Sequence, residues 1–144
     1  MKIVNKSNNP LPEYATRGSS GMDIRAWFED GNPVTLKPGD WTLIPTGLYI
    51  DLIRGFELQI RARSGLALKH GIAVLNGLGT IDSDFKNEIK VILINLGKDD
   101  FTINSGDRIA QMVLAKTERL YLDEVSEIDR RDDRGGGFGH TGIN

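Results

Sequence analysis

Alternation of apolar and polar residues is the feature that most constrains this chain. Over residues 56–63 the side chains of Phe56, Leu58, Ile60 and Ala62 fall on one face, and four polar side chains fall on the other. A period of two residues is that of a β-strand with one buried face. Further strands are predicted at residues 41–45, 48–52, 91–94 and 108–115. The strand at 91–94 is apolar at every position, which predicts burial on both of its faces.

Turn residues interrupt the predicted strands at short intervals. Residues 45–47, Pro-Thr-Gly, separate two of them, and the turn at residues 104–107 leads into the last. Helix is scarce, and the best candidate is Ser64–His70, with Ser64 as N-cap and Gly71 just past its end. Many short strands with turn signals about every ten residues predict an all-β sandwich or barrel.

Composition narrows the chemistry. The chain has no Cys and only two His, which excludes disulfides and thiolate sites and disfavours a zinc site. A metal, if used, is expected to be Mg2+ held by oxygen atoms and by a substrate's phosphates. The net charge of -2 does not indicate binding to nucleic acid. No signal peptide is visible and no apolar run reaches the roughly 18 residues of a membrane span, so no membrane and a cytoplasmic location are expected.

Residues 126–144 differ from the rest of the chain. Apolar residues almost vanish there, a mixed charge run occupies residues 129–134, and glycines follow around a lone Phe138. Such a tail cannot bury itself and is expected to be mobile when alone. We therefore expect one domain over 1–144, with a β core at 1–125 and a C-terminal tail at 126–144. A frayed end is the alternative, but a Phe among glycines favours a tail that covers a ligand.

An anion site is predicted where the strand at residues 56–63 meets the short helix. Ser64 offers a hydroxyl, the helix start offers free N–H groups, and Gly65 lets a ligand approach them. Arg63 adds a guanidinium group that suits phosphate. The residues alone leave open a Ser-Gly cap with Arg63 on a solvated face. Two single residues stay open as well: Asp23 is a turn residue or holds a metal-bound water, and Gln111 is a core amide or a ligand contact.

A second candidate site lies in the extended segment 77–85. Asp82 and Asp84 are two residues apart and point to the same side, so one could be a general base that deprotonates a water. A turn with solvated carboxylates is the alternative. A Ca2+ loop fails, because Lys86, Asn87 and Leu93 stand where that loop requires an oxygen ligand, a Gly and a Glu.

Five short motifs, in order, make the sequence resemble the trimeric dUTPase family over nearly its whole length. Each motif alone is weak, whereas five in order at suitable spacing are highly specific. They span residues 20–24 (SGMDI), 63–67 (RSGLA), 79–85 (GTIDSDF), 106–111 (GDRIAQ) and 134–142. The resemblance implies a jelly-roll-like β-barrel or sandwich of the β-clip type with one short helix. It also implies a homotrimer whose active sites are shared between chains.

The resemblance further implies an activity, which is the Mg2+-assisted hydrolysis of dUTP to dUMP and pyrophosphate by in-line attack of water on the α-phosphorus. Such an enzyme limits uracil incorporation into DNA and supplies dUMP for dTMP synthesis. Asp82 would orient or deprotonate the water. Mg2+ would bridge the three phosphates and complete its shell with waters, one of them held by Asp23.

Substrate-binding residues are implied in every part of the site. The phosphates would be bound by Arg63, Ser64, Gly65, Gln111 and Arg134. The uracil would be bound by Asn76, which helps to reject cytosine, by the backbone of a hairpin at residues 71–85 that includes Gly79, Thr80 and Ile81, and by Phe138 and Gly139 of the tail. The ring of Phe85 would pack on the sugar and leave no room for a 2'-hydroxyl. Closure of the tail over a neighbouring chain's site would exclude bulk water.

Three departures from the family pattern are visible. Phe85 stands where Tyr is usual, which keeps the ring but loses a hydroxyl, and Asn87 stands where Gly is usual. The fifth motif is one residue shorter between Arg134 and Phe138, and Arg131 or Arg130 is the alternative contact for the γ-phosphate. The rival interpretations are a dCTP deaminase of the same fold superfamily, which needs a general-base Glu, and a non-catalytic jelly-roll binding protein.

Overall fold

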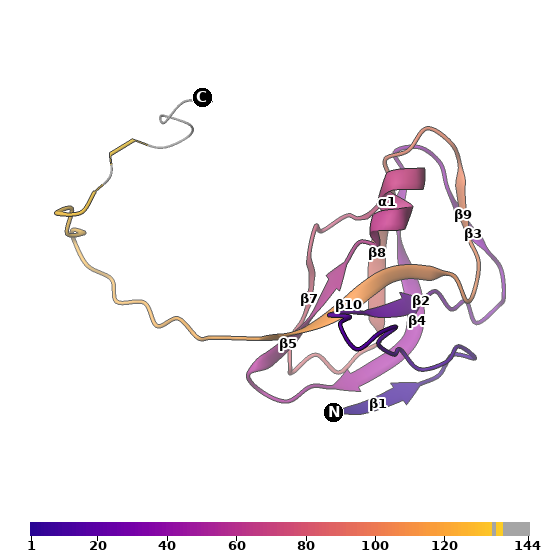
Figure 1. Ribbon diagram of the computed structural model, residues 1–144, viewed down its shortest axis with the longest axis horizontal. Helices are drawn as coiled ribbons and strands as arrows, with labels where there is room; N and C mark the ends of the chain where they lie inside the picture. Colours follow the sequence, from indigo (N-terminus) through magenta and orange to yellow (C-terminus); the bar gives the residue numbers. More distant parts are fainter. Residues whose placement is uncertain (134, 137–144) are drawn as a thin grey trace.

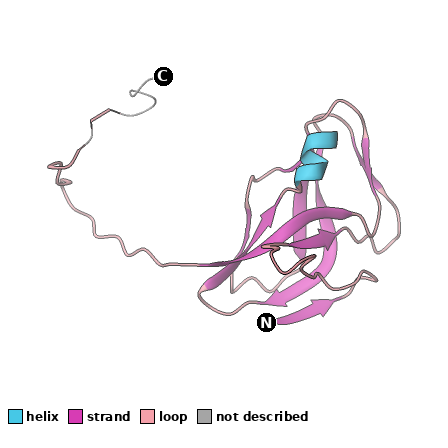
Figure 2. Ribbon diagram, viewed as in Figure 1, coloured by secondary structure: helices cyan, strands magenta, loops and turns pink. Residues whose placement is uncertain are grey.

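The computed structural model describes residues 1–133 and 135–136, and it is built from antiparallel strands with one short helix (Figures 1 and 2). The elements are β1 (Lys2–Asn5), β2 (Met22–Arg25), β3 (Val34–Leu36), β4 (Trp41–Asp51), β5 (Phe56–Arg61), α1 (Ser64–His70), β6 (Ile72–Val74), β7 (Gly79–Ile81), β8 (Ile89–Asn95), β9 (Phe101–Ile103) and β10 (Arg108–Lys116). One sheet has the order β1-β4-β8-β6, a second has the order β2-β10-β5-β7, and β3 pairs with β9. The prediction of an all-β chain is confirmed.

Side chains from both four-stranded sheets pack into one hydrophobic core. Ile24 and Leu58 from one sheet and Ile44 and Val91 from the other are each at most 1% exposed. Burying an aliphatic side chain of this size stabilises the fold by about 1.5–3 kcal/mol. The alternation at residues 56–63 follows the prediction in its centre, since Leu58 and Ile60 are buried and Gln59 between them is only half-buried. Phe56 and Ala62, at the ends of the same face, are half-buried.

β4 corrects the prediction of two strands broken at residues 45–47. It is a single strand, and its register with β8 shifts between Pro45 and Leu48. Two hydrogen bonds hold this bulge in place, one to the first residue of β8 and one to the residue just before it. Thr46 Oγ1 donates to the carbonyl oxygen of Ile89 at 2.6 Å, and Glu88 Oε1 accepts from the N–H of Gly47 at 2.8 Å. The donors freed by the bulge are therefore satisfied locally, and the strand continues instead of turning.

β8 is less buried than its apolar sequence predicts. Ile89, Val91 and Leu93 are buried, whereas Ile92 and Ile94 are only half-buried. Burial on both faces is therefore wrong for this strand in the single chain. The reason is that the sheet packs on the core through one face only, so alternate side chains keep part of their contact with solvent.

The hairpin predicted for residues 71–85 is not a paired ladder. β6 pairs with β8 in one sheet, and β7 pairs with β5 in the other. A turn with a hydrogen bond from the N–H of Gly77 to the carbonyl oxygen of Val74, at 3.0 Å, carries the chain between them. The chain crosses between sheets here because both short strands find longer partners at the sheet edges.

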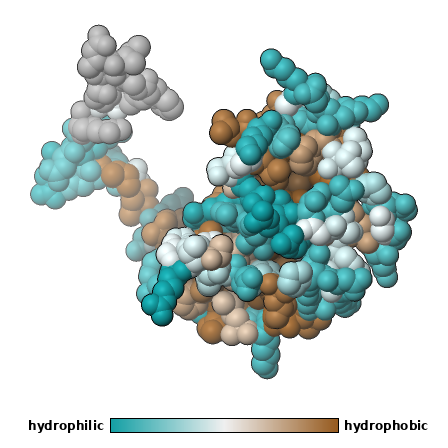
Figure 3. Space-filling model, turned by 45° about the vertical axis from the view of Figure 1, so that its right-hand side comes forward, coloured by the Kyte–Doolittle hydropathy of each residue, from teal (hydrophilic) through white to brown (hydrophobic). Residues whose placement is uncertain are grey.

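Residues 117–133 contain no helix or strand and run away from the two sheets (Figure 1). Several apolar side chains on this stretch are open to solvent, and Figure 3 shows apolar residues exposed along it. Leu120, Tyr121 and Leu122 are each more than 80% exposed. The last strand ends at Lys116. The division of the chain into a core at 1–125 and a tail at 126–144 stays a prediction.

Candidate active site

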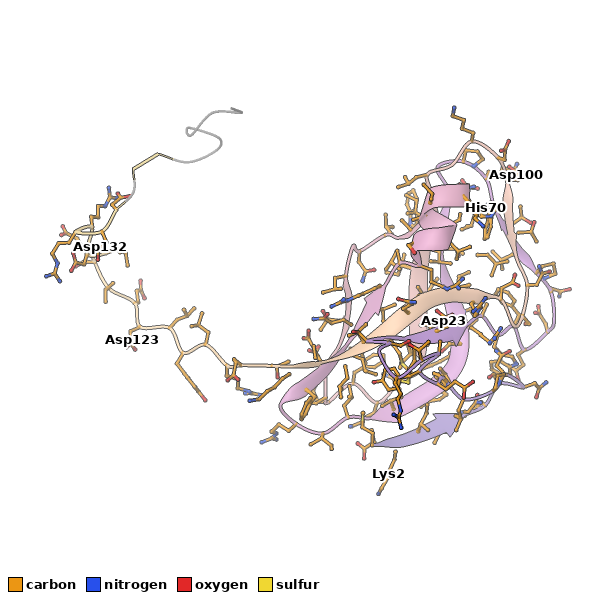
Figure 4. The ribbon with its side chains drawn as sticks, in the orientation of Figure 1. Lys2, Asp23, His70, Asp100, Asp123 and Asp132 are labelled. Carbon is orange, nitrogen blue, oxygen red and sulfur yellow. The ribbon has the colours of Figure 1, made fainter. Side chains whose placement is uncertain are left out.

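Asp23 is the centre of a polar cluster that joins three separate segments of the chain. It lies on β2 beside β10 (Figure 4), where it pairs in register with Gln111. Arg63 Nε donates to Asp23 Oδ1 at 3.0 Å, and Arg108 Nη1 donates to Asp23 Oδ2 at 3.1 Å. Gln111 Nε2 donates to Oδ1 at a longer 3.4 Å. The structure therefore brings together the predicted site residues Asp23, Arg63 and Gln111 from the first, second and fourth motifs.

Arg108 also belongs to this cluster, although no role was predicted for it from the sequence. Regular alternation would place residues 108 and 111 on opposite faces of a strand. The register between β10 and β2 shifts between Arg108 and Ala110, and the adjacent residues Ile109 and Ala110 are both buried. A bulge of this kind re-aims a side chain, so Arg108 and Gln111 both reach Asp23. The sequence feature that could have indicated a role for Arg108 is its position inside the fourth motif.

Three arginines give this region an excess of positive charge. Arg63 and Arg108 share the single carboxylate of Asp23, and Arg25 stands opposite Arg108 in the pairing of β2 with β10. Arg25 Nη1 donates to the carbonyl oxygen of Gly106 at 2.6 Å. The three side chains line a cavity of about 430 Å³ that also touches α1 and β9. Guanidinium groups held in place around a cavity suit a phosphorylated ligand.

Helix α1 begins directly beside this cluster. The prediction that Ser64 is its N-cap is wrong, because Arg63 is the N-cap, with extended backbone at φ -85° and ψ 124°. Ser64 is instead the first helical residue and is exposed. Within the described chain no side chain caps the helix, and its first turn carries no acidic residue. A Cβ at Gly65 would meet no atom within 4 Å, so a ligand has an open approach to the first N–H groups.

The third motif lies at the other edge of the same sheet. Gly79 on β7 stands opposite Ile60 on β5 and is buried. A Cβ at Gly79 would come within 3.1 Å of Ile60 Cβ and 3.4 Å of Asn76 Nδ2, so the backbone packs closely on both. Asn76 and Thr80 are exposed, and Ile81 is half-buried.

The turn that follows β7 carries the predicted general base. The N–H of Phe85 donates to the carbonyl oxygen of Asp82 at 3.1 Å. Asp82 is exposed, and Phe85 is half-buried and lines a depression together with Tyr49 and Lys90. The turn therefore presents a solvated carboxylate and an aromatic ring.

Asp82 lies far from the arginine cluster within one chain. The pairing of β5 with β7 puts Ile81 opposite Leu58, whereas Arg63 follows the end of β5. A strand rises about 3.3 Å per residue, which separates the backbones of Asp82 and Arg63 by roughly 15–20 Å. By this estimate, a single chain does not bring Asp82 to the cluster.

Three predicted site residues, Arg134, Phe138 and Gly139, lie outside the described residues. Within the part of the chain that the structure describes, no group of three or more His, Asp or Glu side chains is placed to hold a metal ion. Among the same residues, no helix has the length and apolar character needed to cross a membrane.

Together the fold and the cluster define an antiparallel β protein with a cationic site suited to a phosphorylated small molecule. The sequence profile of the dUTPase family matches residues 7–142. The chain therefore belongs to the dUTPase family.

Individual relatives agree with this assignment. The deoxyuridine 5'-triphosphate nucleotidohydrolase of Finegoldia magna is 57% identical over 142 residues, which cover 99% of this chain and 98% of that protein. The protein of the same name from Neorickettsia sennetsu is 56% identical over 132 residues, which cover 92% and 87%. A solved dUTPase mutant of Staphylococcus bacteriophage 80alpha, with dUpNHpp, has a TM-score of 0.82 at 21% identity and covers 99% of this chain and 98% of that one. This likeness confirms the predicted jelly-roll-like fold.

Proposed function

We propose that the chain hydrolyses dUTP to dUMP and pyrophosphate. The observation that carries this proposal is the cluster of Asp23, Arg63, Arg108 and Gln111, which unites three family motifs in one cationic site. Relatives of 57% and 56% identity carry the name of this activity. A nucleoside triphosphate brings several negative charges, and fixed guanidinium groups are the side chains best matched to them.

In this proposal Arg63, Ser64, Gly65 and Gln111 hold the triphosphate. Only 22% of the Arg63 side chain is exposed, and Asp23 fixes the direction of its guanidinium group. A guanidinium group can form two parallel hydrogen bonds to one phosphate. The Ser64 hydroxyl and the first N–H groups of α1 supply further donors. Arg108 adds a second guanidinium group beside Arg63.

The proposed reaction is an in-line displacement at the α-phosphorus. A water oxygen forms a bond to that phosphorus while the bond to the bridging oxygen breaks, and pyrophosphate leaves with the electron pair. Asp82 orients this water and takes its proton. A positioned general base contributes about 10²–10⁴-fold to such a rate.

Mg2+ is the proposed metal, and the residues present fit a site in which the substrate supplies most of the direct ligands. Both carboxylate oxygens of Asp23 already accept hydrogen bonds from arginines. Such a carboxylate suits a hydrogen bond to a metal-bound water better than direct coordination, and Mg2+ commonly keeps several waters. When bound, the ion would neutralise charge on the phosphates. The D95N mutant of the dUTPase from phage phi11 of S. aureus coordinates a structural Mg(II) ion.

We propose that the complete site forms between three copies of the chain. A general base must lie within hydrogen-bond reach of the water it activates. Asp82 lies roughly 15–20 Å along the sheet from Arg63, so one chain alone does not meet this condition. A threefold assembly can bring Asp82 of one copy to the arginine cluster of another. Residues 126–144 of a copy would then close the site, with Arg134 on the γ-phosphate and Phe138 and Gly139 at the uracil.

Base and sugar selection are proposed to rest on the third motif. Uracil presents one N–H donor between two carbonyl acceptors, and backbone groups of residues 79–81 can complement that edge. The close packing of Gly79 on Ile60 supports a rigid wall, which is needed to discriminate against a single methyl group. Asn76 helps to reject cytosine, and the ring of Phe85 leaves no room for a 2'-hydroxyl.

The test is pyrophosphate release, with Mg2+, from dUTP, dTTP, dCTP and UTP in parallel. We expect fast release from dUTP alone. A folded protein that releases no pyrophosphate from dUTP would contradict the proposal and indicate a binding protein. Ammonia appearing from dCTP would indicate the deaminase.

A further inference from the structure

The loop at residues 82–88, between β7 and β8, is attached to β4 at two points. Near the middle of the loop, Lys86 Nζ donates to Asp51 Oδ1, at the end of β4, at 2.7 Å. At its end, Glu88 Oε1 accepts from the N–H groups of Thr46 at 3.2 Å and Gly47 at 2.8 Å. The Glu88 contacts hold the bulge of β4, whereas the Lys86 contact acts on the half of the loop that carries Asp82.

Lys86 also binds the turn itself. Its Nζ donates to the carbonyl oxygen of Ser83 at 2.8 Å. The same turn is closed by the hydrogen bond from the N–H of Phe85 to the carbonyl oxygen of Asp82 at 3.1 Å. The ammonium group of Lys86 therefore joins the turn to the end of β4. Lys86 itself lies outside the five motifs.

We propose that Lys86 is a positioning residue, which uses Asp51 as a fixed anchor to hold the Asp82–Phe85 turn in the geometry that hydrolysis requires. This inference rests on the proposed function, because Asp82 and Phe85 matter only if the chain turns over a nucleotide. Lys86 touches neither the water nor the substrate in this account. It acts on the reaction through the turn alone.

The exposure of the Lys86–Asp51 ion pair determines whether loss of Lys86 should affect stability or catalysis. The side chains of Lys86 and Asp51 are 54% and 58% exposed, and an ion pair this exposed contributes little to global stability. Catalysis is far more sensitive, because a displacement of about 1 Å in a catalytic group can cost a hundredfold in rate. Loss of Lys86 should therefore lower the rate and leave the fold nearly unchanged.

The test compares Lys86→Met, which keeps most of the aliphatic stem, with Lys86→Arg, which keeps the charge and the donors. For Lys86→Met we expect kcat on dUTP to fall about five- to tenfold while KM stays within about twofold and Tm within about 2 °C. Lys86→Arg should return kcat to within about twofold of the parent. Lys116→Met is the matched control, because it removes another exposed ion pair, with Glu118 at 3.5 Å, that includes no residue of the loop.

Amide hydrogen exchange supplies a second measurement that does not depend on activity. Exchange in the peptide that covers residues 82–88 should quicken severalfold in Lys86→Met and remain at the parent rate in Lys116→Met. An unchanged kcat with unchanged exchange would overturn the proposal. So would a loss of kcat that Lys86→Arg does not restore, or one that follows a large fall in Tm. If the parent chain does not hydrolyse dUTP, the proposed function fails, and the exchange rates alone decide whether Lys86 holds the turn.

Discussion

Asp23 lies between two guanidinium groups with 24% of its side chain exposed. A carboxylate in this position balances charge and also aims Arg63 and Arg108 toward one cavity. Without it, the like charges of Arg63 and Arg108 would face each other with no carboxylate between them. The proposed site therefore depends on Asp23 for the direction of its phosphate-binding groups, in addition to any contact with a metal-bound water.

Replacing Asp82 by Asn tests the role of the general base. We expect Asp82→Asn to fold, to assemble and to bind dUTP as the parent does, while kcat falls about 10²–10⁴-fold, because the amide cannot accept the proton from water. Asp84→Asn is the matched control, since Asp84 is also exposed and lies two residues away. Steady-state kinetics and nucleotide binding check both variants. Near-normal turnover in Asp82→Asn would rule out the assigned role.

Single residues of the cluster were predictable from the sequence because they stand inside recognisable motifs. Asp23, Arg63 and Gln111 were predicted in this way and come together in the structure. Arg108 was missed, because its contact depends on a register shift that one strand's own sequence does not specify. Ser64 was predicted as an N-cap from its residue type, and the extended backbone of Arg63 displaced it by one position.

Among the elements, alternation predicted β5 well, because a strand with one buried face repeats every two residues. Long-range partners decided the rest. β4 continues through Pro45, Thr46 and Gly47 because Glu88 and Ile89, more than forty residues later, satisfy the freed groups. β6 and β7 separate into different sheets because β8 and β5 offer them free edges. These pairings join residues far apart in the chain, so the sequence of one segment does not specify them.

Acid titration tests the attachment of the 82–88 loop to β4. A hydrogen bond from Lys86, and then its charge, hold the pKa of Asp51 below the ordinary value of 3.8. A carboxyl group with a pKa lowered by folding stabilises the fold above its unfolded pKa, and this contribution is lost as the pH falls through the folded pKa. We expect Asp51→Asn to have a slightly lower Tm than the parent at neutral pH, with the difference shrinking as the pH falls below 3.8. A difference that persists or grows in acid would contradict this assignment.

The described chain as a whole has a packed core and a long exposed extension. Leu120, Tyr121 and Leu122 are almost fully exposed on a stretch without helix or strand. Contiguous apolar residues of this kind commonly mark contact with another protein surface. This agrees with the proposal that copies of the chain assemble and share their active sites.

Deleting residues 135–144 tests the proposed covering role of the tail. These residues follow the core, so we expect the shortened chain to fold and to assemble as the parent does. Its kcat/KM on dUTP should fall by about 10²-fold or more, because an uncovered site admits bulk water and aligns the phosphates poorly. Circular dichroism, light scattering and steady-state kinetics report the three outcomes. An unfolded product would show that the tail is structural.

In the proposed assembly, the arginine cluster and Asp82 of one active site come from different copies of the chain. The most direct measurement is dUTP hydrolysis by a co-refolded mixture of Asp82→Asn and Arg63→Gln, each of which should be nearly inactive alone. In a random equal mixture, about a quarter of the sites would combine an intact Asp82 with an intact Arg63, so activity should recover to about a quarter of the parent value. A mixture as inactive as its two components would contradict the claim and place both residues of each site in a single chain.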